Sequence, residues 1–200
     1  MPSHAVHRKW GSRILGVALP EVDDLAEAGW SAERYREASA YVAERFGSEA
    51  VEYLDLHIVL DRMEGLLRDL AARTLMSMEP VFDEDSVREW LRDLIGQLRE
   101  ALLSDSAVAG TRVGPALVDR IFGGEAIYGI IYDILSSEDF QSEVTSAMVD
   151  IILGERYHVK LAYRSREAAR DDTWGEEAIG KRIEWLLYAL DTLKDRGRQD

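Results

Sequence analysis

Residues 48–77, SEAVEYLDLHIVLDRMEGLLRDLAARTLMS, form the longest uninterrupted helical pattern in the sequence. Apolar residues recur along this stretch at alternating spacings of four and three, which places them on one face of a helix. They are Leu56, Leu60, Met63, Leu67 and Leu70. Further apolar residues occupy the other side of the first half, which is typical of a helix enclosed by other helices. We therefore expect a long central helix around which the rest of the chain packs.

Helix-capping and helix-stopping residues divide the remainder of the chain into further helices. Gly16 and Gly47 are placed to end helices, Pro20 to begin one, and Pro80 to interrupt one. No stretch shows a convincing strand alternation. The pattern leaves open whether the helix that begins near residue 138 ends at Gly154 or continues to about residue 170. We expect an all-α globular bundle of seven or eight helices, built around residues 48–77.

The chain length favours a single domain over residues 1–200, because 200 residues suffice to bury a substantial core. The clearest loop is SDSAVAGTRVG, residues 104–114. If the chain has a domain boundary, we expect it in this loop.

Composition excludes several classes of function. The chain has no cysteine, which excludes a disulfide scaffold, a thiol nucleophile and a cysteine-ligated metal site, and which fits a cytoplasmic location. Its net charge of −14 disfavours nucleic acid and anionic membranes as partners. No segment is apolar over the roughly 18 residues that a membrane helix requires.

The strongest candidate site lies in the central helix. His57 and Asp61 are one turn apart and therefore share a helix face. A histidine beside a carboxylate is an arrangement that binds divalent metal ions, or that lets the histidine act as a general base. The alternative is that His57 is a satisfied core histidine and that Asp61 pairs with Arg62 or with a neighbouring helix. His7, close to Trp10 in the first predicted helix, is a further candidate ligand.

Two weaker patterns lie near the C-terminus. Glu155 and His158 have the E-x-x-H spacing found in carboxylate-bridged di-iron bundles, but the chain has one such step where two are needed. They could add ligands to a composite metal site, or they could be an exposed polar turn. Arg156, Lys160 and Arg164 form a basic stripe for RNA, phosphate or an acidic partner, unless it is a solvated helix face.

Two functional hypotheses follow from these observations. The first is a non-catalytic, acidic helical module that binds a protein partner or itself, supported by the five tryptophans and eight tyrosines. The second is a metal-dependent hydrolase or oxidoreductase, in which His57 and Asp61 bind a divalent metal, with His7, Glu155 and His158 as possible additional ligands. The first is preferred on the sequence alone, because the second combines individually weak signals.

Overall fold

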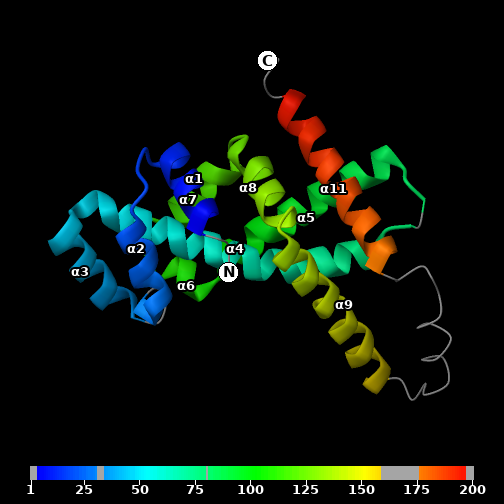
Figure 1. Cartoon of the computed structure of the whole chain (residues 1–200), viewed down its shortest axis with the longest axis horizontal. Coiled ribbons are helices and arrows are strands. Elements are labelled where there is room, and N and C mark those ends of the chain that lie inside the picture. Colours follow the sequence, from blue (N-terminus) through cyan, green and yellow to red (C-terminus); the bar gives the residue numbers. More distant parts are fainter. Residues whose placement is uncertain (1–3, 31–33, 80, 159–175, 197–200) are drawn as a thin grey trace. The chain divides into compact units, whose positions relative to one another are not determined.

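Helices account for all of the regular secondary structure among the residues that the structure describes. This computed structural model describes residues 4–30, 34–79, 81–158 and 176–196, with the backbone alone at residues 29–30, 149–158, 176 and 194–196. Ten α-helices and one π-helix lie within these ranges, which confirms the predicted all-α fold class with more helices than expected (Figure 1). None of the described helices has the length and apolar character needed to cross a membrane.

The N-terminal helices are short, and the predicted residues Gly16, Pro20 and Gly47 mark several of their ends. They are α1 (His4–Ile14), α2 (Pro20–Leu25), the π-helix η1 (Ala26–Trp30) and α3 (Tyr35–Phe46). Pro20 begins α2 because its fixed φ suits a first helical position. Gly16 and Gly47 adopt φ of +79° and +93°, a region that glycine enters without steric cost, so both positions end a helix as expected.

The central helix α4 runs from Ser48 to Ser77, the bounds predicted from the sequence. On its predicted apolar face, Leu56, Leu60, Met63 and Leu67 are fully buried, and Leu70 is half-buried. The other side of its first half is buried too, at Val51, Leu54 and Ile58, among others. Such all-round burial is what the apolar composition of this half predicts.

The remaining helices follow α4 along the chain. They are α5 (Glu84–Ser104), α6 (Ser106–Ala109), α7 (Gly114–Phe122), α8 (Ala126–Leu135), α9 (Glu138–His158) and α11 (Glu176–Arg196). The expected loop at 104–114 holds the single turn of α6, which begins because the Asp105 carboxylate accepts the Ala107 and Val108 N–H groups. Helix α9 does not end at Gly154 but continues to His158.

Contacts divide the chain into two units. Unit 1 comprises residues 1–66 and 97–130, and unit 2 comprises residues 67–96 and 131–200. The loop at 104–114 lies wholly inside unit 1, while α4 contributes residues to both units. The prediction of a single domain stays a prediction. The candidate site lies in unit 1, where α2, α3 and the first part of α4 share one apolar cluster.

Candidate metal centre

His57 and Asp61 are in direct contact on α4. The His57 Nε2 and Asp61 Oδ2 atoms are 3.2 Å apart, as the one-turn spacing predicts. The His57 side chain is buried, whereas 21% of the Asp61 side chain is exposed. The pair therefore reaches from the core of unit 1 towards solvent.

Helix α1 adds a second histidine to this pair. His7 is buried, and its Nε2 atom lies 3.3 Å from Asp61 Oδ1. The His7 and His57 rings are 4.0 Å apart between centroids and inclined by 44°. One potential ligand atom from each of His7, His57 and Asp61 lies within 4.8 Å of the other two. Three candidate ligands from two helices thus converge on one point.

Close packing against glycines places α1 at this position. Trp10 lies over Gly129 of α8, where a Cβ atom would be 2.6 Å from the indole ring. Gly11 lies against Tyr53 of α4, where a Cβ atom would be 2.3 Å from the phenol ring. Both contacts require the absence of a side chain, so they fix where α1 lies. Because His7 is one turn before Gly11, its imidazole faces the same part of α4.

Three buried polar atoms at this point have no hydrogen-bond partner. They are both ring nitrogens of His7 and Oδ1 of Asp61. His7 Nε2 and Asp61 Oδ1 are close enough for electrostatic attraction, but their geometry does not satisfy a hydrogen bond. Burying polar atoms without partners is costly, and most such atoms in folded proteins are satisfied. Unsatisfied nitrogen and oxygen atoms that face one another are what a cation would coordinate.

Asp23 of α2 holds the other side of His57. Its Oδ1 atom lies 3.1 Å from His57 Nδ1 and accepts a 2.9 Å hydrogen bond from the Tyr53 hydroxyl. Its Oδ2 atom accepts a 3.1 Å hydrogen bond from Arg8 Nε. A carboxylate on Nδ1 orients the imidazole and directs Nε2 towards Asp61, as outer-shell carboxylates do around metal-bound histidines.

The charges in this network balance one another. Burial alone would lower the pKa of His57, but hydrogen bonds with Asp23 and Asp61 outweigh it and raise the pKa to about 9. Burial opposes ionisation of Asp61, yet its contacts with His57 and His7 keep its pKa below the ordinary value. Burial likewise opposes ionisation of Asp23, and its bonds from His57, Tyr53 and Arg8 lower its pKa. In the absence of a metal ion, the raised pKa favours the imidazolium form of His57, which lies between two carboxylates.

The other candidate residues do not join this cluster among the described side chains. His4, the other histidine of α1, forms ion pairs with Glu27 and Asp24 instead. The side chains of Glu155, Arg156 and His158 lie outside the described residues, as do Lys160 and Arg164 altogether. The composite site with Glu155 and His158, and the basic stripe, therefore stay predictions.

Asp23 is the residue that sequence reasoning missed. The segment PEVDDL contains two adjacent aspartates, and nothing in their type separates Asp23, which is fully buried, from Asp24, which is exposed. A signal was present in the helical phase. Val22 and Ala26 mark the buried face of this segment. On the helical wheel Asp23 lies about 60° from Ala26, next to this face, whereas Asp24 lies about 160° from Ala26.

Comparisons of the chain with protein-family models, curated proteins and solved structures found no match.

Proposed function

We propose that this chain binds one divalent transition-metal ion through His7, His57 and Asp61, and that the ion supports metal-assisted hydrolysis or oxidation. The observation that carries the proposal is the convergence of one potential ligand atom from each of His7, His57 and Asp61. Two of these residues, His7 and Asp61, also have buried polar atoms without hydrogen-bond partners. The pairs His57 Nε2–Asp61 Oδ2 and His7 Nε2–Asp61 Oδ1 are 3.2 and 3.3 Å apart. Two ligands on one tetrahedral zinc ion are about 3.3 Å apart. One ligand atom from each of the three residues lies within 4.8 Å of the other two, so binding would draw the ligands closer together and displace the proton from His57 Nε2.

The ligand types narrow the choice of ion. Two imidazoles and one carboxylate, without sulfur, suit Zn²⁺, Fe²⁺, Co²⁺ and Mn²⁺ better than Cu⁺. Three protein ligands leave at least one coordination position for water, which is typical of catalytic rather than structural zinc sites. The partial exposure of Asp61 supports access of water to that position. Asp23 would act as the outer-shell carboxylate of His57.

The metal content of the purified protein tests this proposal directly. We expect one equivalent of a transition metal, measured by inductively coupled plasma mass spectrometry, and saturable Zn²⁺ or Mn²⁺ binding by the metal-free protein in calorimetry. The matched pair of variants is His7→Ala and His4→Ala, because both histidines lie on α1 and only His7 faces the cluster. We expect a loss of affinity of about 100-fold or more in His7→Ala, with no change in His4→Ala.

Two results would overturn the metal proposal. One is a wild-type protein that binds none of these ions, and the other is equal binding by both variants. His57, Asp23 and Asp61 would then form a structural charge network inside unit 1. If a metal is bound, hydrolysis of an activated phosphodiester and reduction of oxygen should be assayed with the loaded protein. Activity that depends on His7 separates a catalytic ion from a structural one.

A second candidate function is binding of a protein partner or self-association, and a specific feature of unit 2 favours it. Phe82 lies 5.6 Å from Trp185 and 6.0 Å from Tyr188 between ring centroids. Phe82 and Tyr188 are both exposed, as is Val81 beside them. Exposed aromatic clusters are common at protein interfaces.

The cytoplasmic location expected from the absence of cysteine stays a prediction.

Light scattering after size-exclusion chromatography tests this second function. We expect an oligomer that dissociates in Phe82→Asp and persists in Tyr41→Asp, which alters an exposed tyrosine of unit 1. A wild-type protein that remains monomeric at high concentration contradicts self-association.

A further inference from the structure

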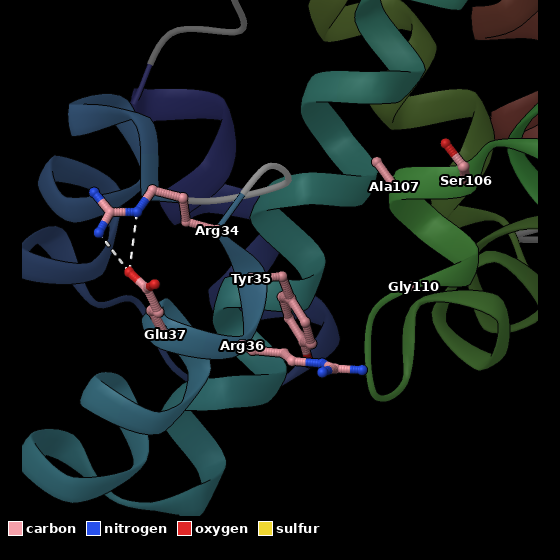
Figure 2. Close-up of a pocket in the computed structure, with 7 residues that line it drawn as sticks. All are labelled: Arg34, Tyr35, Arg36, Glu37, Ser106, Ala107 and Gly110. Atoms are coloured by element: carbon pink, nitrogen blue, oxygen red, sulfur yellow. Dashed lines mark hydrogen bonds and ion pairs between the residues drawn. The ribbon is translucent and has the colours of Figure 1, made fainter.

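A cavity of about 440 Å³ lies in unit 1 between the start of α3 and the turn of α6 (Figure 2). This volume falls in the range of small-molecule sites, about 300–1,000 Å³. One wall consists of Arg34, Tyr35, Arg36 and Glu37, and the other of Ser106, Ala107 and Gly110. None of these residues belongs to the proposed metal centre.

The walls of the cavity are held in place by hydrogen bonds. The Tyr35 hydroxyl accepts a 2.8 Å hydrogen bond from the Arg112 N–H and lies next to the Asp55 carboxylate. Asp55 is fully buried on α4 and accepts a 2.8 Å hydrogen bond from the Val113 N–H. The opposite wall is fixed at Asp105, which caps α6. The cavity is therefore formed before any ligand binds.

The charge of the cavity is positive, in contrast to the chain as a whole. Arg34 and Glu37 neutralise each other through an ion pair, and Arg62 does the same for Asp105, next to the far wall. Arg36 forms no ion pair or hydrogen bond through its guanidinium with any described residue, and it extends towards the turn at Gly110 (Figure 2). One net positive charge thus remains at this cavity on a protein of net charge −14.

We infer that this cavity binds a small organic anion through its phosphate or carboxylate group, with Arg36 as the principal contact. The planar guanidinium donates two parallel hydrogen bonds to either group, which a lysine could not do. The Tyr35 ring on one wall and Ala107 on the other offer apolar surface to the body of the ligand, and Ser106, beside Ala107, offers a hydroxyl group. The inference does not depend on the proposed metal centre.

Calorimetric titration of the full chain with pyrophosphate and with citrate, at low ionic strength, tests the inference and separates the two ligand groups. We expect saturable binding of one equivalent of at least one probe. In Arg36→Gln the affinity should fall at least about tenfold, because a charge-assisted pair of hydrogen bonds is lost. The control Arg92→Gln removes an exposed arginine from α5, outside the cavity, and should bind as the wild type does.

Amide NMR shifts locate the binding independently of the variants. Shifts on addition of the probe should be concentrated at residues 34–37 and 106–110, and they should persist in His7→Ala, which separates this cavity from the metal centre. The inference is overturned by the absence of saturable binding up to about 10 mM of both probes. It is also overturned by equal affinity of Arg36→Gln and the wild type, or by shifts located elsewhere.

Discussion

Gly11→Ala tests whether the contact between α1 and α4 is as close as the structure indicates. A Cβ atom at Gly11 would lie 2.3 Å from Tyr53 Cε2 and 2.7 Å from the Val17 carbonyl oxygen. Tyr53 cannot swing away freely, because its ring is fully buried and its hydroxyl donates a hydrogen bond to Asp23. The Val17 oxygen belongs to the backbone, so the added methyl group must displace α1 itself.

The expected loss of stability follows from two opposing effects. Overpacking a core position costs about 1–3 kcal/mol, and a clash with backbone belongs in the upper part of that range. Alanine in place of glycine inside a helix returns up to about 1 kcal/mol. We therefore expect Gly11→Ala to lower the free energy of unfolding by about 2 kcal/mol, or roughly thirtyfold in the folding equilibrium constant.

Urea denaturation followed by far-ultraviolet circular dichroism measures this change. Gly65→Ala is the matched control, because Gly65 is also helical, in unit 1, and no described atom of its surroundings lies within 4 Å of a Cβ atom there. That variant should be more stable than the wild type by up to about 1 kcal/mol. The difference between the two variants isolates the packing effect, since both add the same methyl group to a helix.

The reasoning is refuted if Gly11→Ala is at least as stable as the wild type, or if both glycine variants change the free energy of unfolding equally. Either result would mean that α1 is not seated against Tyr53. The placement of His7 beside Asp61, one turn earlier on α1, depends on the same contact and would then be refuted as well.

Three further changes test the polar contacts of unit 1. Asp23→Ala should lower the free energy of unfolding by about 3–5 kcal/mol, because it removes one of the two carboxylates that contact the buried His57 cation. The control Asp24→Ala, at the adjacent exposed position, should change the free energy of unfolding by less than about 0.5 kcal/mol in the same denaturation experiment. Asp105→Asn should lower the free energy of unfolding by about 0.5–1 kcal/mol at pH 7, because asparagine keeps the α6 cap but not the ion pair with Arg62. Burial opposes ionisation of Asp105, but the ion pair with Arg62 and the α6 N–H groups lower its pKa. The stabilisation by the charged form is therefore present above the unfolded pKa near 3.8 and should disappear as the pH falls below that value. A difference in stability between Asp105→Asn and the wild type that stays constant from pH 7 to about pH 2 argues against this assignment. Burial raises the pKa of Asp55, so Asp55→Asn, which keeps the acceptor without the charge, should change the free energy of unfolding by less than about 1 kcal/mol. Asp55→Ala should lower it by about 1–3 kcal/mol in thermal unfolding, and equal losses in the two variants contradict the hydrogen bond to Val113, the residue before α7.

The helix boundaries were predictable where local chemistry sets them. Helix α4 begins after Gly47, whose φ of +93° is open to glycine, and its last residue, Ser77, comes three positions before Pro80 in the sequence. The turn of α6 was not predicted, because a four-residue helix has no periodicity to detect. Its only local signal is the cap at Asp105, which also suits an ordinary loop.

The candidate site likewise has one part that local sequence predicts and other parts that depend on how the helices pack. The contact between His57 and Asp61 follows from their spacing on one helix, so the sequence predicts it. The approach of His7 depends on how α1 packs against α4, which no local pattern specifies. Asp23 depends on packing still more, because burial separates it from Asp24 although the two are chemically identical.

The contacts of Asp23 also set the rotation of α2 about its own axis. Oδ1 is shared by two groups of α4, and Oδ2 is used by α1, so neither oxygen can be given up without loss. Successive helical residues are about 100° apart, so inserting one residue between Pro20 and Asp23 would turn this carboxylate away from α4. An insertion in the preceding segment, residues 16–19, would leave that phase unchanged. Length variation in this part of the protein should therefore be confined to the connection between α1 and α2.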